Sequence, residues 1–210
     1  MKLMMLYGVN CTIDIWDYIS PYLESYEIDY VEYPHEITLY AKKVEDISRW
    51  VYENYGHNCY DAIIGHSLGG IIALQLAAIY KMKTNKIIYL DTNLKPANDF
   101  YRNLMTPKNM ERYGKSILEM LNKEKKFYTD ELMKSIQSNF DYTDMVYEII
   151  PDIYAIYGDR GIPEYPERIK DLNLPIEILK KLNLIFIQDS CHLIMIENPK
   201  QLFEVIKDIL

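Results

Sequence analysis

Short apolar runs alternate with longer stretches of helical spacing along most of this chain. The runs expected to form strands are 3–7, 28–33, 62–64, 87–90, 153–157 and 184–187. The stretches expected to form helices are 14–23, 37–55, 68–80 and the segment from Pro199 onward, since proline suits a first helical turn. Alternation of this kind predicts parallel βαβ units, and runs without polar positions are typical of strands covered on both faces.

The alternation stops between Asp91 and Pro151. No strand is evident over roughly sixty residues, which is longer than an ordinary connection. Helical spacing appears near 117–121 and again near 132–140. We therefore expect one domain over residues 1–210, with a helical insertion over about 94–150 that acts as a lid.

Composition limits the function classes. The chain has 210 residues and a formal net charge of −8, so nucleic acid and anionic membrane surfaces are not expected as partners. No stretch approaches the roughly 20 apolar residues of a membrane span, and the first residues are expected to form a buried strand rather than a signal peptide. The cysteines Cys11, Cys59 and Cys191 are too few and too scattered for a disulfide framework or zinc site. A cytoplasmic protein with reduced thiols is expected.

One motif indicates a catalytic function. It is Gly65-His66-Ser67-Leu68-Gly69-Gly70, between an expected apolar strand and an expected apolar helix. This is the G-x-S-x-G pattern in its required strand–turn–helix context. Small residues on either side of the serine let strand and helix approach closely, and the turn lifts the serine oxygen to the helix N-terminus, where negative charge is stabilised. Ser67 is thus a candidate nucleophile. The glycine spacing is not that of a dinucleotide or phosphate loop, so no cofactor is expected. No metal is expected either, because His66 and His192 are not spaced as metal ligands on a helix.

Serine needs a neighbouring base, and the chain has four histidines. His66 adjoins the serine, so its side chain is expected to point away. His35 and His57 lie in loops before the motif. His192 follows the last expected strand, and loops after parallel strands gather at the edge where open α/β sheets place their sites. His192 is therefore the candidate base.

These residues resemble the α/β-hydrolase superfamily over nearly the whole chain. Residues 65–70 match its nucleophile elbow, and 191–199 resemble its histidine segment, with Cys191 in place of the usual glycine. Residues 6–9, followed by Trp16, resemble its first oxyanion segment, with Tyr7 in place of the usual histidine. The resemblance implies an α/β-hydrolase fold, a mostly parallel sheet flanked by helices, and an oxyanion hole formed by the amides of Val9 and Leu68.

The triad acid has two candidates. Most of the superfamily carries an aspartate three residues after a glycine behind the penultimate strand, and that position here is Gly161. Asp159 lies two residues early. Asp91, at the end of the strand 87–90, offers the alternative that some relatives use, and we prefer it because the G-x-x-D pattern is missing. Either aspartate could instead serve only as a strand-end or turn residue.

The resemblance implies hydrolysis of a small to medium carboxylic ester, thioester or amide through an acyl-serine. A largely apolar small molecule is the expected partner, while the oligomeric state stays open. Apolar side chains of the insertion could line the substrate pocket, although most are expected to pack the insertion onto the core: Phe100, Tyr101, Leu104, Met105, Met110, Tyr113, Met120, Phe127, Met133, Phe140 and Met145. A ligand-binding protein on a hydrolase scaffold is the alternative, supported by the missing G-x-x-D acid.

Overall fold

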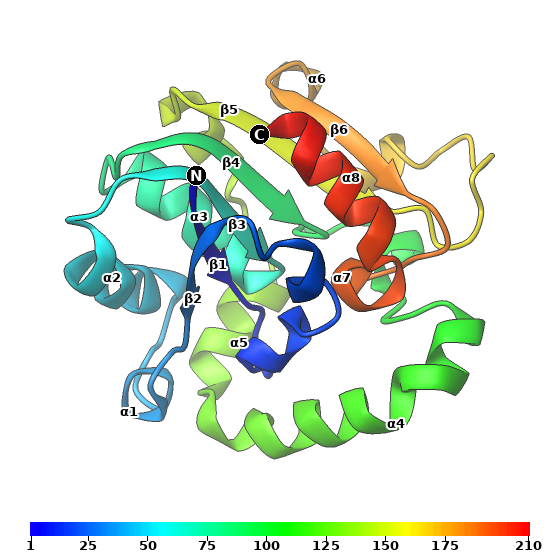
Figure 1. Ribbon diagram of the computed structural model, residues 1–210, viewed down its shortest axis with the longest axis horizontal. Helices are drawn as coiled ribbons and strands as arrows, with labels where there is room; N and C mark the ends of the chain where they lie inside the picture. The colour runs from blue at the N-terminus through cyan, green and yellow to red at the C-terminus, as the bar shows by residue number, and fades with distance from the viewer.

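A six-stranded sheet forms the centre of the protein (Figure 1), whose computed structural model describes residues 1–210. The strand order is β2-β1-β3-β4-β5-β6, and every neighbouring pair is parallel. The strands are β1 (Lys2–Leu6), β2 (Glu27–Val31), β3 (Tyr60–His66), β4 (Thr84–Leu90), β5 (Asp152–Gly158) and β6 (Leu182–Ile187). The predicted α/β fold with a parallel sheet is confirmed.

The register brings the carboxyl ends of the central strands level with one another. His66 pairs with Leu90, and Leu90 pairs with Ile156. The residue after each strand still bonds to the neighbouring strand: the Ser67 amide donates to Leu90 O at 3.0 Å, and the Asp91 amide donates to Ile156 O at 2.8 Å. Ser67 and Asp91 therefore leave the sheet side by side.

Helices cover both faces of the sheet (Figure 1). On one face α3 (Leu68–Ala78) packs against β3 and β4 and is covered in turn by α2 (Val44–Tyr55), so all of its residues are buried. This explains the apolar character of α3 all round. On the other face lies α8 (Pro199–Ile209), where the ring of Phe203 stacks on Tyr22 at 5.6 Å. The predicted start of the last helix at Pro199 is confirmed.

Two helix predictions were wrong in part. The stretch 14–23 forms two short 3-10 turns, η1 (Ile13–Trp16) and η2 (Ser20–Tyr22), instead of one helix. The stretch 37–55 is broken into α1 (His35–Thr38) and α2. The carboxylate of Asp46 accepts from the amides of Lys42 and Lys43 at 2.9 and 3.2 Å, which caps a new helix at this point.

The segment between β4 and β5 contains helices and no strand. Its elements are η3 (Asp99–Arg102), α4 (Pro107–Glu124), η4 (Lys125–Phe127), α5 (Asp130–Gln137) and η5 (Thr143–Glu148). Figure 1 shows α4 running along one side of the molecule, away from the sheet, before α5 returns toward the sheet. The remaining short helices are η6 (Lys170–Leu172), α6 (Ile176–Leu179) and α7 (Ile194–Glu197).

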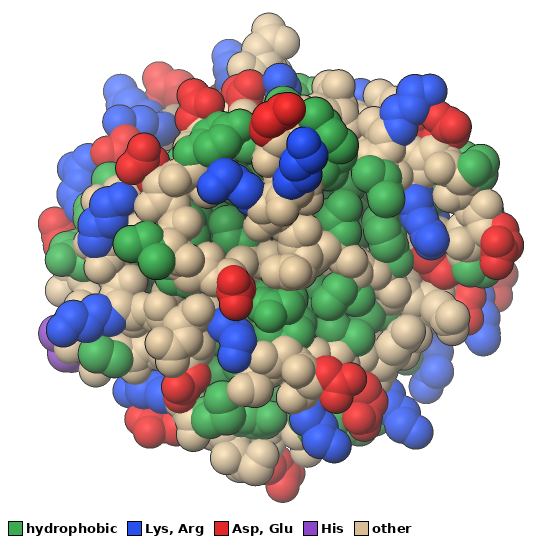
Figure 2. All heavy atoms as spheres, turned by 90° about the horizontal axis from the view of Figure 1, so that it is seen from above, with side chains coloured by type: hydrophobic (Ala, Val, Ile, Leu, Met, Phe, Trp, Pro, Cys, Tyr) green, Lys and Arg blue, Asp and Glu red, His purple; other side chains and the backbone are tan.

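The surface carries charges of both signs. Figure 2 shows Asp and Glu side chains interspersed with Lys and Arg over the face seen from above, with apolar atoms exposed between them. That face therefore has no patch of a single sign. None of the helices combines the length and the apolar character needed to cross a membrane.

Candidate active site

Ser67 lies in a strained turn between β3 and α3. Its φ of 52° and ψ of −117° fall in a region that side chains larger than glycine rarely adopt. The neighbouring glycines allow this turn, because a Cβ at Gly65 would lie 2.2 Å from Gly69 O and one at Gly69 would lie 2.2 Å from Leu6 O. Strand, turn and helix thus approach as closely as the sequence motif predicts.

Positive φ values recur just after the neighbouring strands. Asp91 after β4, Arg160 after β5 and Asp189 after β6 have φ values of 45°, 59° and 51°. Such conformations are uncommon outside glycine and persist only where the surrounding structure holds them. Four adjacent strands are therefore each followed within two residues by a residue of this kind, and two of these residues, Ser67 and Asp91, line the cavity described next.

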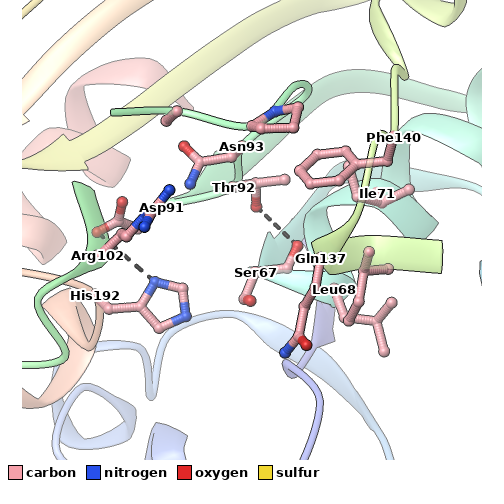
Figure 3. Close-up of a pocket in the computed structure, with 13 residues that line it drawn as sticks. Ser67, Leu68, Ile71, Asp91, Thr92, Asn93, Arg102, Gln137, Phe140 and His192 are labelled. Carbon is pink, nitrogen blue, oxygen red and sulfur yellow. Dashed lines mark hydrogen bonds and ion pairs between the residues drawn. The ribbon is translucent and has the colours of Figure 1, made fainter. Parts of the chain in front are cut away.

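A cavity of about 490 Å³ opens at this edge of the sheet (Figure 3). Its volume lies in the range of small-molecule sites. The lining residues are Ser67, Leu68, Ile71, Asp91, Thr92, Asn93, Pro96, Ala97, Arg102, Ile136, Gln137, Phe140 and His192. Figure 3 shows Ser67 between His192 on one side and Leu68 on the other, with Phe140 and Ile71 beyond. Ser67 and His192 thus face one space.

His192 lies in the loop after β6 with its side chain 28% exposed. Its Nδ1 lies 3.9 Å from Asp91 Oδ2, while its amide donates to Leu104 O at 3.1 Å. Burial lowers the pKa of the imidazole from 6.5, the Asp91 carboxylate opposes this shift, and the charge of Arg160 adds to it. The ring is therefore neutral at physiological pH and able to accept a proton.

The structure brings Asp91, and not Asp159, to His192. Asp91 is 1% exposed and forms an ion pair with Arg160, whose Nη2 lies 2.8 Å from Oδ2. Asp159 is also buried, but its Oδ1 accepts from the amide of Gly161 at 2.8 Å and it does not line the cavity. Asp159 therefore closes the turn after β5.

His66 does not simply point away from the site. Its Nε2 donates to the backbone oxygen of His192 at 3.0 Å, and the two rings lie 4.6 Å apart. A carbonyl oxygen only accepts, so Nε2 carries the proton; Nδ1 is buried without a partner. Burial, and then the neighbouring His192, hold the pKa of His66 well below 6.5. His66 is thus a neutral support for the His192 backbone.

The two candidate oxyanion amides lie on either side of the turn. Leu68 is the first residue of α3 and lines the cavity. Val9 follows β1, and its amide has no backbone acceptor. A Cβ at the adjacent Gly8 would lie 3.0 Å from the Ser67 Cβ, so this loop touches the nucleophile closely. The Tyr7 hydroxyl accepts from the amide of Tyr33 at 2.8 Å and thereby anchors the loop.

Of the apolar insertion residues considered for the pocket, Phe140 lines this cavity. The other ten pack in or against the hydrophobic core, as expected for most of them. Polar side chains that the sequence did not single out line the cavity too: Thr92, Asn93, Arg102 and Gln137. The lining is therefore mixed rather than largely apolar.

Arg160 was not predicted as a site residue from the sequence. It is the one basic residue in the segment 157–161. The available signal is its place just after the apolar run 153–157, because an arginine that is buried at such a strand end is expected to be paired.

Comparison with known proteins shows which solved structures share this fold. No protein-family model and no curated protein matches the sequence. Solved structures do match. A hydrolase from Oleispira antarctica superposes with a TM-score of 0.79 at 14% identity, covering 99% of this chain and 90% of that one. This is the scaffold of the α/β-hydrolases.

Two more α/β-hydrolase structures match over the whole chain. An N-acyl homoserine lactone degrading enzyme has a TM-score of 0.74 at 13% identity and is covered to 93%. A thermophilic esterase from Thermogutta terrifontis has a TM-score of 0.73 at 13% identity and is covered to 89%. At such identity the likeness concerns the α/β-hydrolase fold, and the chemistry must be argued from the residues of this chain.

Proposed function

We propose that this protein is a serine hydrolase that cleaves a small to medium carboxylic ester, or a related thioester, amide or lactone, through an acyl-Ser67 intermediate. The observation that carries the proposal is the strained Ser67 facing the same cavity as the neutral imidazole of His192. The α/β-hydrolase scaffold, shared with esterases and a lactone-degrading enzyme, supports the same reaction class.

The roles follow from the chemistry of acyl transfer. His192 takes the proton from the Ser67 hydroxyl as the oxygen attacks the carbonyl carbon, and then gives it to the leaving group. A water molecule, deprotonated by His192, then attacks the carbonyl carbon of acyl-Ser67. This step releases the carboxylic acid and restores free Ser67. The amides of Val9 and Leu68 are assigned to the oxyanion, and Asp91 to the imidazolium that forms.

The polar side chains of the cavity narrow the class of substrate. Ile71, Ile136 and Phe140 provide apolar surface for a short acyl chain, whereas Asn93 and Gln137 offer hydrogen bonds. The substrate therefore combines a modest apolar part with polar groups. We assign the helical segment over about 94–150 as the lid, since it contributes much of this lining.

A fluorophosphonate probe tests the proposal without knowledge of the substrate. Wild-type protein should be labelled, Ser67→Ala should not, and Ser116→Ala, which alters an exposed serine, should label as the wild type does. A panel of chromogenic esters and lactones then defines the acyl preference.

A ligand-binding protein without turnover is the second candidate. It is favoured by the 3.9 Å between His192 Nδ1 and Asp91 Oδ2, which is longer than a hydrogen bond. Absence of labelling in folded wild-type protein, together with tight binding of a small ester or acid, would establish the ligand-binding function instead.

A further inference from the structure

We propose that Arg160 is a positioning residue that holds Asp91 at the sheet edge and sets the basicity of His192 through that carboxylate. The inference rests on the proposed serine hydrolase function. It begins with the hydrogen bonds of the guanidinium. Nε donates to Phe100 O at 3.2 Å, Nη1 to Gly158 O at 2.7 Å, and Nη2 to Asp91 Oδ1 at 2.9 Å and Tyr101 O at 3.3 Å. All three nitrogens thus have partners, and the group is fixed in place.

The pair is buried on both sides. The side chains of Arg160 and Asp91 are 1% and 0% exposed. A carboxylate removed from water in this way needs a counter-charge, and a neutral imidazole does not supply one. Arg160 lies at the next strand end and shares the left-handed backbone of Asp91, so both residues are held where their side chains meet. The pair is therefore part of the sheet edge and not a chance surface contact.

The two oxygens of Asp91 have different surroundings. Oδ1 accepts the hydrogen bond from Arg160. Oδ2 lies near the same nitrogen but accepts no hydrogen bond, and it is the oxygen that faces His192 Nδ1 at 3.9 Å. A shift of about 1 Å would complete a hydrogen bond there. Arg160 Nη2 thus lies within 2.9 Å of both oxygens, and because its hydrogen bond goes to Oδ1, Oδ2 can still accept one from the imidazole. The charge of Arg160 meanwhile restrains the carboxylate and opposes an imidazolium.

Other charged or titratable groups also face His192 or its loop. They are His66 from β3, Asp91 after β4, Arg102 from η3, Arg160 after β5, and Cys191 and Glu197 in the histidine segment. Among the two arginines, Arg102 is 72% exposed and pairs with Asp99, so solvent screens it. Arg160 is the buried cation that contacts the carboxylate directly.

A merely structural arginine would tie the backbone at Phe100 and Tyr101 to β5 without affecting proton transfer. The pH dependence of Ser67 labelling separates the two roles. The variants are Arg160→Gln, which removes the charge, and Arg160→Lys, which retains it with fewer hydrogen bonds. In Arg160→Gln the imidazolium of His192 becomes more favourable, so a larger share of His192 is protonated at pH 6 and cannot act as a base. The ratio of the labelling rate at pH 6 to that at pH 8.5 should therefore fall about threefold or more below the wild-type ratio. In Arg160→Lys the ratio should stay close to the wild-type value.

The inference is overturned if both folded variants keep the wild-type ratio, or if both change it equally. Should Arg160→Gln not fold, NMR of the wild type decides. The Nε resonance of buried Arg160 should then shift with the same pH midpoint as labelling, and a resonance that stays constant rejects the coupling. Failure of the wild type to label at all would instead reject the serine hydrolase function, so the two failures are distinguishable.

Discussion

The Nε2 of His66 lies 3.0 Å from the backbone oxygen of His192, so the residue before the nucleophile supports the loop of the base. This partly buried contact links the end of β3 to the loop after β6. We expect His66→Ala to lower the rate of Ser67 labelling about tenfold, because the His192 carbonyl loses its donor and the ring its neighbour. The control is His57→Ala, which alters an exposed histidine and should label normally. A wild-type rate in His66→Ala would contradict this role.

Stability should fall as the pH drops below 6.5. Burial lowers the pKa of both His66 and His192 in the folded protein, whereas both histidines titrate near 6.5 when unfolded. Below that pH the unfolded chain binds more protons, so the free energy of unfolding decreases toward acid. Urea denaturation at pH 7.5 and pH 5.5 measures the effect.

His66→Gln provides the matched control for this pH effect, since glutamine can still donate a hydrogen bond and does not titrate. The loss of stability between the two pH values should be smaller in the variant than in the wild type. An equal loss in both proteins would mean that His66 is not responsible.

Asp91→Asn should lower kcat by about 10³- to 10⁴-fold, because an amide in place of the carboxylate no longer stabilises the imidazolium or fixes its tautomer. Asp159→Asn should be mild, since an asparagine oxygen can still accept from the Gly161 amide. Turnover of a chromogenic ester by the two variants measures both. The reverse result, a mild Asp91→Asn and a severe Asp159→Asn, would move the acid to Asp159.

Phe140→Ala should change the acyl preference by opening one wall of the cavity. The ratio of kcat/KM for an octanoate ester to that for an acetate ester should rise about threefold or more, because added methylenes gain apolar surface to bury. Phe127→Ala is the control, since Phe127 stacks on His35 at 3.5 Å and does not line the cavity. Equal ratios in the two variants would show that Phe140 does not limit the length of the acyl chain.

Much of the fold could be predicted because its central strands contain continuous apolar runs. Ile63, Ile64, Ile87 and Ile88 are fully buried in neighbouring strands, and their sequence pattern reports that burial directly. The break between α1 and α2 was missed because it depends on a single carboxylate, Asp46, folding back on the chain. Apolar spacing alone does not carry that information.

The candidate site, too, could be predicted only in part. Ser67 and His192 stand in local motifs, so the sequence alone could nominate them. Arg160 acts on Asp91 across 69 positions of the chain, and His66 acts on the His192 backbone across 126. Contacts of this kind arise from the alignment of strand ends, which no local pattern encodes. The mixed lining of the cavity was missed for the same reason.

The chain leaves the sheet after β4 and returns to the next strand in the sheet, β5, with about sixty residues between them. Because a loop's closure cost rises by only about 0.6 kcal/mol for each doubling of its length, such an excursion can be lengthened at little entropic cost to the sheet. A change in the length of this segment therefore alters the lining of the cavity, while the paired strands that end at Ser67 and Asp91 keep their register. Any altered segment must still present three backbone carbonyls: those of Phe100 and Tyr101 to Arg160, and that of Leu104 to the His192 amide.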